Sequence, residues 1–194
     1  MMVAPTLASR QQAIDQAKRI LAQNPVYLDT ETTGLGITDE IVEISIVDDA
    51  GSTLFNSLVR PKQPIPAAAQ AIHHISNEEV QKALPWPIVW QQVRPFLLGK
   101  VIIAYNSDFD QRMLKQSYTL YRLPWNETLD FQDLLKLYSQ WRGEWDPFRR
   151  SWKFFSLSNA GKAANIPLPN THRSTADSLL ARALLHYLAA QTVE

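Results

Sequence analysis

Two acidic residues, Asp29 and Glu31, follow a short apolar segment and are candidates for metal ligands. Residues 26–28 are Val, Tyr and Leu, which favour a β-strand, and the Thr-Thr-Gly at 32–34 ends it. Side chains two positions apart on a strand point to the same face, so the two carboxylates project together at a Cα spacing of roughly 7 Å. Buried carboxylates repel one another unless cations neutralise them. The segment therefore predicts a divalent-metal platform, and two exposed acids entering a turn are the alternative.

A third acid, Asp110, follows the apolar run at 101–105, which is typical of a strand buried on both faces. It falls in the first turn of an expected helix, where a carboxylate is also favourable for the helix dipole alone. Asp108 lies on the same turn and competes for the same role. On an ideal helix the two residues are about 200° apart, so only one of them can face the Asp29–Glu31 platform.

His172 and Asp177 form a further candidate pair near the C-terminus. They would lie some 140° apart around one continuous helix, which would not direct both side chains at one point. A loop position for His172 and a first-turn position for Asp177 would bring them together. The alternative is a capping box over residues 174–177, in which Asp177 only caps the helix. One carboxylate cannot easily fill both roles.

Residues 141–155 hold six aromatic and four basic side chains. This composition favours a surface that stacks bases and holds the phosphates of a single strand. The alternative is a covering flap or a subunit interface, because large aromatic residues in loops usually pack against a core. From this segment we expect Trp145, Arg149 and Trp152 to contact a substrate.

Length and composition limit the class of protein. The chain has 194 residues, long enough for one domain with a proper core, and 45% hydrophobic and 20% charged residues are ordinary for a globular protein. The formal net charge is +0, which argues against coating duplex nucleic acid by charge alone. There is no cysteine for a disulfide or thiolate site, and no apolar run approaches the ~18–20 residues that span a membrane. We therefore expect a cytoplasmic protein without a membrane association.

The periodicity predicts an α/β fold with a mixed sheet of about five strands flanked by helices, and an extra N-terminal helix. That helix is expected to open with a capping box at Ser9 and to end at Asn24-Pro25. The first three strands should form an antiparallel meander. Strands are expected near 26–31, 40–47, 53–59, 101–105 and 128–130, a loop at 139–155, and further helices at 67–74, 77–82, 87–98, after 106, around 134–138, at 156–164 and at 174–190.

Taken together, these motifs resemble those of the DEDDh exonucleases, the family of the proofreading (epsilon) subunit of DNA polymerase III, within the ribonuclease H-like fold. The likeness covers about residues 25–190. Residues 29–34 match the first family motif, 106–110 the second and 172–177 the third. Because the family's acid follows the Phe, the second motif selects Asp110 over Asp108. Residues 72–76 resemble the family's His-Gly-Ile-Thr/Ser segment, with His74 where Gly is usual.

The resemblance implies a metal-dependent 3′–5′ exonuclease that hydrolyses single-stranded nucleic acid, DNA more than RNA, to nucleoside 5′-monophosphates. Two Mg²⁺ or Mn²⁺ ions ~3.5–4 Å apart would clamp the attacking and leaving oxygens. The implied metal ligands, which also count as catalytic residues, are Asp29, Glu31, Asp110 and Asp177. His172, as a histidine titrating near neutral pH, would be the general base. Thr32, Asn106 and Phe109, which lie within the motifs, are expected to contact substrate.

Two other functions stay open at this point. One is an RNA-trimming exoribonuclease or oligoribonuclease of the same family, because the groups that sense a 2′-hydroxyl are not readable from the sequence. The other is a non-catalytic subunit that binds a polymerase or another replication or repair partner. The full set of mutually repelling acids argues against an idle site. We expect residues 1–24 to be a helical appendage and 25–194 to be the exonuclease domain, in an undetermined oligomeric state.

Overall fold

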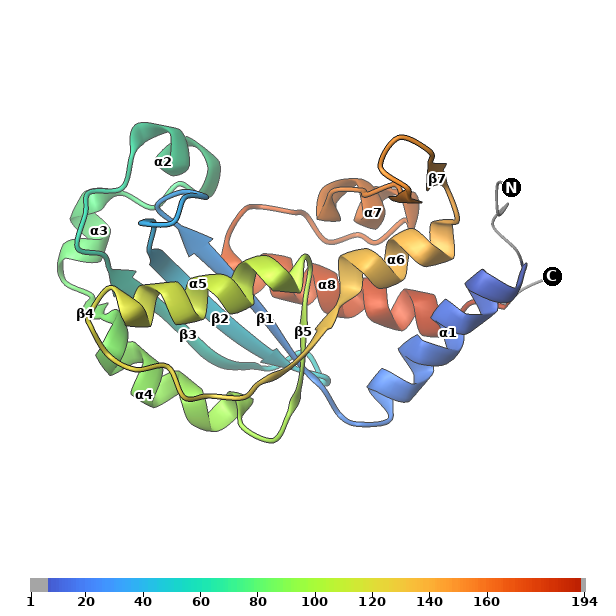
Figure 1. Cartoon of the computed structure of the whole chain (residues 1–194), viewed down its shortest axis with the longest axis horizontal. Coiled ribbons are helices and arrows are strands. Elements are labelled where there is room, and N and C mark those ends of the chain that lie inside the picture. Colours follow the sequence, from blue (N-terminus) through green and yellow to red (C-terminus); the bar gives the residue numbers. More distant parts are fainter. Residues whose placement is uncertain (1–6, 193–194) are drawn as a thin grey trace.

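The computed structural model describes residues 7–192, and it contains a six-stranded sheet covered by helices on both faces (Figure 1). The strands of this sheet are β1 (Val26–Thr32), β2 (Ile41–Asp48), β3 (Thr53–Arg60), β4 (Leu84–Pro85), β5 (Val101–Ala104) and β6 (Asp130–Asp133). A separate hairpin pairs β7 (Trp145–Asp146) with β8 (Ser151–Trp152). The helices are α1 (Leu7–Leu21), α2 (Ala67–His73), α3 (Asn77–Gln81), α4 (Trp86–Leu97), α5 (Ser107–Thr119), α6 (Leu134–Arg142), α7 (Leu157–Ala163) and α8 (Ser174–Ala189).

The strand order is β4-β3-β2-β1-β5-β6, which places β1 in the interior of the sheet. β1, β2 and β3 form the expected antiparallel meander, whereas β5 runs parallel to β1 and β6 runs parallel to β5. The sheet is therefore mixed, as the sequence predicts. The short strand β4 pairs in parallel with β3 through two residue pairs at the edge of the sheet, and this gives one strand more than expected.

Alternation along β1 and β5 divides the apolar side chains between two cores. Tyr27 and Ile103 pack with α1, α6, α7 and α8 on one face. Leu28 and Ile102 pack with α4 and α5 on the other face. Figure 1 shows α4 and α5 on the near face of the sheet and α8 behind it. The parity of a residue on β1, that is, whether its number is odd or even, therefore decides which set of helices its side chain contacts.

Three sequence expectations differ from the structure. The first helix begins at Leu7, so that Ser9 lies inside it and is not its cap. The predicted loop at 139–155 is in part helical, because α6 continues to Arg142, where Gly143 ends it in the left-handed conformation at φ 69°. The rest of that segment folds into the β7–β8 hairpin. The strand expected at 128–130 lies at 130–133, where it pairs with β5. Local propensity could not reveal these tertiary pairings.

His74 ends α2 with φ 60°, in the left-handed region, and its amide donates to the carbonyl of Gln70. Glycine adopts this conformation most readily, which gives a physical reason for Gly at the equivalent place in the motif that residues 72–76 resemble. Within residues 7–192, no helix has both the length and the apolar content that a membrane crossing requires.

Candidate active site

The end of β1 carries two of the expected ligands on one face. Asp29 and Glu31 share the parity of Tyr27, so their side chains point toward the face that α8 covers. Both residues are partly exposed. The strand thus delivers two carboxylates to the edge of the core that contains α8.

Asp177 comes to the same place from the first turn of α8. One carboxylate oxygen each from Asp29, Glu31 and Asp177 lie within 4.8 Å of one another. Asp177 does not close a capping box, because the helix begins after Arg173 and shows no side-chain cap bond from that residue. Instead, the amide of Thr171 donates to Asp177 Oδ1 at 3.2 Å. The carboxylate is therefore turned toward the preceding loop and the other acids.

Asp110 approaches β1 from the other side of the sheet. It is buried in the first turn of α5, and Thr30 Oγ1 donates to its Oδ1 at 2.7 Å. Thr30 has the opposite parity to Asp29, and the group of three acids within 4.8 Å of one another does not include Asp110. Asp108 is 72% exposed and forms an ion pair with Lys136 at 2.6 Å. The two acids of this turn thus point in different directions, as the helical geometry predicts.

The acids repel one another and are poorly solvated. Burial, followed by the charges of Asp110 and Glu31, raises the pKa of Asp29 well above its usual value. Burial is also the largest cause for the others: it raises the pKa of Glu31 to about 8, that of Asp110 to about 7 and that of Asp177 to about 6. Ionisation of these acids at neutral pH therefore costs free energy in the folded protein, and a bound cation would offset that cost.

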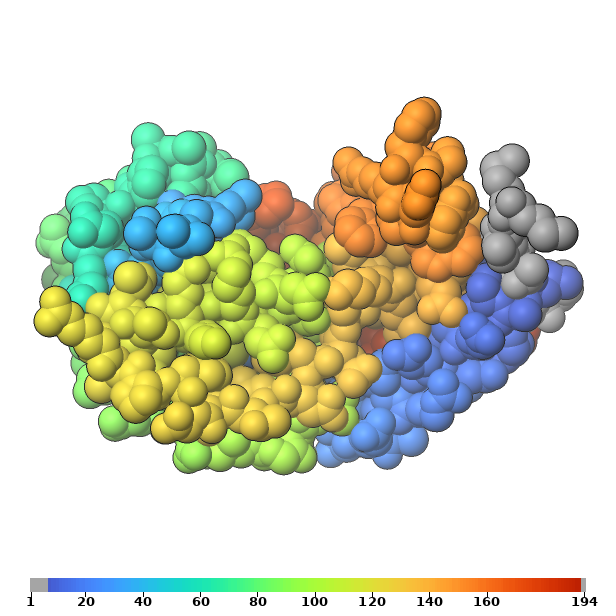
Figure 2. Space-filling model, viewed as in Figure 1, coloured from blue at the N-terminus to red at the C-terminus, as the bar shows by residue number. Residues whose placement is uncertain are grey.

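His172 shares a cleft with two of the acids. The cleft has a volume of about 450 Å³ and is lined by Asp29, Tyr105, Ser156, Leu157, Ser158, Asn170, His172 and Asp177. His172 is exposed and lies in the loop before α8 with φ 52°. Figure 2 shows this hollow between the segment that contains α2 and the segment that contains α7 and the hairpin, with the red-orange chain before α8 on its floor. His172 and Asp177 thus occupy the loop and first-turn positions that would bring them together.

The expected substrate residues lie outside the lining of this cleft. Thr32 is buried, and its hydroxyl donates to the carbonyl of Gly34 at 2.8 Å. Phe109, in the first turn of α5, packs against the core, and Asn106 precedes that helix with φ 72°. Trp145 and Trp152 pack edge to face across the hairpin with ring centroids 5.3 Å apart, and Arg149 extends from the turn between them.

The aromatic segment divides into a packed part and an exposed part. Trp141 and Phe155 pack against the core that contains α8, and Tyr105 Oη donates to the carbonyl of Phe155 at 2.6 Å. Phe148, at the hairpin turn, is 97% exposed. Packing as a flap therefore accounts for the ends of the segment, and the hairpin itself remains available for a ligand.

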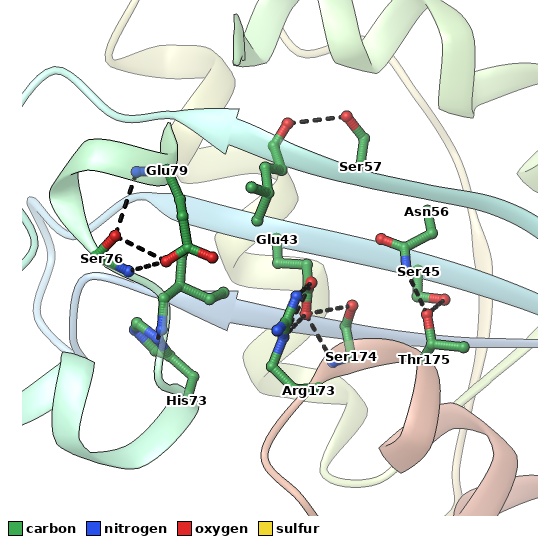
Figure 3. Close-up of polar contacts among 12 residues, drawn as sticks. Glu43, Ser45, Asn56, Ser57, His73, Ser76, Glu79, Arg173, Ser174 and Thr175 are labelled. Carbon is green, nitrogen blue, oxygen red and sulfur yellow. Dashed lines mark hydrogen bonds and ion pairs between the residues drawn. The ribbon is translucent and has the colours of Figure 1, made fainter. Parts of the chain in front are cut away.

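Sequence reasoning missed Glu43, which lies beside the acids on β2. It pairs directly across from Glu31, and it contacts Arg173 and Ser174 at the start of α8 (Figure 3). Burial alone would raise the pKa of Glu43, but hydrogen bonds from Arg173 and Ser174 lower it below the usual value. The signal available in the sequence was a charged residue in an otherwise apolar strand centre, Ile41-Val42-Glu43-Ile44.

The donor set fits a hard divalent cation. It consists of carboxylate oxygens, which suit Mg²⁺ or Mn²⁺. Within residues 7–192, no Lys or Arg forms an ion pair with Asp29, Glu31 or Asp177. Closely spaced acids without a direct ion-pair partner are an arrangement that a metal ion stabilises.

Comparison with known proteins gives a consistent result. Residues 26–185 match the family model described as exonuclease. A protein of Escherichia phage 186, named an uncharacterized exonuclease, is 34% identical over 180 residues, which cover 90% of this chain and 92% of that protein. A DNA polymerase III subunit epsilon-like protein of Rhodobacter capsulatus is 38% identical over 102 residues, covering 49% of this chain and only 14% of that much longer protein.

Two solved structures share the fold. Exonuclease X in complex with 5′ overhanging duplex DNA aligns with a TM-score of 0.63 and 24% identity, over 87% of this chain and 94% of that one. The nuclease domain of 3′hExo, described as a DEDDh family member bound to rAMP, aligns with a TM-score of 0.67 and 17% identity, over 84% of this chain and 89% of that one.

Proposed function

The chain belongs to the exonuclease family, and from this premise we propose that it is a 3′–5′ exonuclease of the DEDDh type that acts on nucleic acid, with the substrate and catalytic residues given below. The proposed reaction is metal-dependent hydrolysis of a single strand from its 3′ end to nucleoside 5′-monophosphates. The observation that carries the proposal is the meeting of Asp29, Glu31 and Asp177 within 4.8 Å, beside a cleft that also holds His172.

The proposed metal ligands are Asp29, Glu31, Asp110 and Asp177. Two Mg²⁺ or Mn²⁺ ions held there would supply charge stabilisation to the attacking and leaving oxygens of the phosphodiester. Asp110 reaches this region from α5, and its charge is the largest electrostatic influence on Asp29 after burial. Four carboxylates would offset the charge of two such ions, which supports a pair of ions rather than one.

His172 is the proposed general base. Its imidazole lies at an exposed position in the cleft and interacts electrostatically with Asp177. An imidazole nitrogen would take the proton of the attacking water and return it to solvent through the open side of the cleft.

The proposed substrate is single-stranded DNA rather than RNA. The exonuclease X complex, which holds a 5′ overhanging duplex, supports DNA over RNA, since its fold covers most of both chains. The bound rAMP in the 3′hExo domain supports RNA trimming as the alternative, in which a 2′-hydroxyl is tolerated at the 3′ end. A direct comparison of DNA and RNA substrates distinguishes the two possibilities.

The β7–β8 hairpin is proposed to contact the strand upstream of the cleaved nucleotide. Its second strand ends at Trp152, shortly before Ser156 and Leu157 in the chain, which line the cleft, and the hairpin carries Trp145, Arg149 and Trp152. Aromatic and basic side chains together suit stacked bases and backbone phosphates. We also propose that the nucleic-acid strand contacts Thr32, Asn106 and Phe109, which lie outside the lining of the cleft.

Association with a polymerase or another replication or repair protein is also proposed. The epsilon-like Rhodobacter relative supports it, although the similarity spans a small part of that protein. A reducing compartment is compatible with a chain that lacks cysteine, and we propose the cytoplasm.

Digestion of end-labelled strands tests the proposal. Purified protein is incubated with single-stranded DNA, RNA and dinucleotides of matched sequence, with Mg²⁺, Mn²⁺ or EDTA. We expect mononucleotides from DNA with either metal, none with EDTA, and protection by a 3′-phosphate but not by a 5′ block. Cutting from the 5′ end, or internal cutting of a circular single strand, would contradict the proposed reaction. Faster release from RNA would favour the trimming alternative, and no turnover with any strand would favour a non-catalytic subunit.

A further inference from the structure

Glu43 is placed where a carboxylate should be unfavourable. It lies in β2 with a side chain only 2% exposed, directly opposite Glu31 in the β1–β2 register. Cross-strand partners share a face of the sheet, and like charges in that position repel. The structure must therefore provide a counter-charge for Glu43 or lose stability.

Arg173 provides that counter-charge. Its Nε lies 3.1 Å from Oε1 and 3.2 Å from Oε2 of Glu43, and its Nη2 donates to Oε1 as well. The Arg173 side chain is 43% exposed, so it stays in contact with solvent while it pairs with a buried acid. It also acts on the neighbouring platform, since its charge opposes the rise in the pKa of Glu31.

The same carboxylate caps α8. The amide of Ser174 donates to Glu43 Oε2 at 2.9 Å, and the hydroxyl of Ser174 donates to the same oxygen at 3.0 Å. Arg173, the residue before the helix, makes no side-chain cap bond of its own. An unpaired helix amide and the positive end of the helix dipole both favour a carboxylate here. A strand residue thus replaces the local cap that the sequence suggested.

The next residue is fixed by the same part of the sheet. Thr175 Oγ1 lies 2.9 Å from Ser45 Oγ on β2 and accepts a hydrogen bond from Asn56 Nδ2 on β3 at 2.6 Å. Figure 3 shows Arg173, Ser174 and Thr175 directed at side chains of these two strands. Three consecutive residues between His172 and Asp177 are therefore attached to the strands beside the acidic platform.

From these contacts we propose that Glu43 and Arg173 are positioning residues, which hold His172 and Asp177 in register with Asp29 and Glu31. The inference rests on the proposed function of that site. Neither residue touches the reacting atoms in this role. Glu43 fixes where α8 begins relative to β1. Arg173 neutralises the buried charge of Glu43, which lies one strand away from the proposed metal ligands. A displacement of about 1 Å in such a site costs ~10²-fold in rate.

The test compares Glu43→Ala, Arg173→Lys, Arg173→Ala and the double alanine variant with wild type. Arg94→Ala is the matched control, because Arg94 also pairs with a glutamate, at 2.6 Å from Glu127, and is similarly exposed at 46%. Three quantities are measured: kcat and KM on a labelled single strand at saturating Mn²⁺, the Mn²⁺ affinity of the protein alone, and the melting temperature.

For Glu43→Ala we expect kcat and Mn²⁺ affinity each to fall about 10–100-fold, the range found for residues that orient metal ligands. KM should change less than about threefold, because substrate contacts are retained. Arg173→Ala should also lower kcat and Mn²⁺ affinity. Arg173→Lys keeps the positive charge but loses the forked guanidinium geometry, so its kcat and Mn²⁺ affinity should lie between those of Arg173→Ala and wild type. The double variant should be no worse than the more severe single variant, because the two residues act as a unit. Arg94→Ala should leave kcat and Mn²⁺ affinity unchanged.

Wild-type kcat and Mn²⁺ affinity in a folded Glu43→Ala protein would overturn the inference, as would equal losses in Arg94→Ala. If Glu43→Ala does not fold, the inference is tested with Arg173→Lys and Ser174→Ala instead. Wild-type kcat and Mn²⁺ affinity in both of these variants would again overturn it. If the wild-type protein degrades no strand, the proposed function fails. The Mn²⁺ affinities of the same variants then still show whether the pair positions the acids.

Discussion

Removal of divalent cations should make the stability of this protein fall as the pH rises. The acids at the end of β1 and their neighbours have pKa values raised by burial and mutual repulsion. Between the usual carboxyl pKa and the raised value, the folded protein binds more protons than the unfolded chain. The free energy of unfolding must therefore decrease with increasing pH in that window. For Glu31 and Asp177 the windows run from 4.5 to about 8 and from 3.8 to about 6.

The size of the effect follows from Glu31. Its pKa rises from 4.5 to about 8, and at ~1.4 kcal/mol per unit the shift corresponds to a ceiling of about 5 kcal/mol. Repulsion between the same pairs of acids contributes to the raised pKa of each of them, so the free-energy contributions of the individual acids cannot be summed. We expect a loss of about 3 kcal/mol between pH ~5 and ~8 in EDTA. For a protein of this size that loss lowers the melting temperature by about 6–12 °C.

Thermal and urea unfolding across this pH range, in EDTA and in excess Mg²⁺ or Mn²⁺, measure the effect. Metal should abolish most of the decline. Glu31→Gln should flatten the curve in EDTA, whereas Asp108→Asn, which removes an exposed acid, should not. His73 contributes in the opposite direction, because burial lowers its pKa, but it is common to all three proteins. A flat or rising curve for wild type in EDTA, or equal slopes in wild type and Glu31→Gln, would refute the reasoning.

Three further outcomes can be measured directly. His172→Ala should lower kcat by ~10²–10⁴ and leave Mn²⁺ affinity intact, and an unchanged rate would mean that the base lies elsewhere. Asp110→Ala should abolish most turnover and Asp108→Ala should cost far less, because only Asp110 is buried beside β1; full activity in Asp110→Ala would remove it from the ligand set. Trp86→Ala should cost about 3–5 kcal/mol in urea unfolding without changing Mn²⁺ affinity, since this first residue of α4 is 1% exposed in the core.

The parts of the fold that the sequence predicted are those governed by local periodicity. The meander of β1, β2 and β3 and the buried strand β5 each have a pattern of apolar residues that one segment specifies by itself. The divergence of Asp108 and Asp110 also follows from helix geometry alone. The β7–β8 hairpin was not predicted, because strands of two residues have too short a sequence pattern to be distinguished from a loop.

Asp177 shows why a strong local signal can still mislead. Residues 174–177 have the spacing of a capping box, and a sequence alone gives no reason to prefer another role for the acid. The structure supplies the helix amide of Ser174 with Glu43 instead, from a strand 131 positions earlier in the chain. Once a distant carboxylate takes over the cap, Asp177 is free to turn toward Asp29 and Glu31. Asp177 and Glu43 are therefore coupled: an acid at the start of α8 that turns toward β1 leaves the helix end to another acid, and the buried Glu43 accepts the hydrogen bonds of Ser174 there.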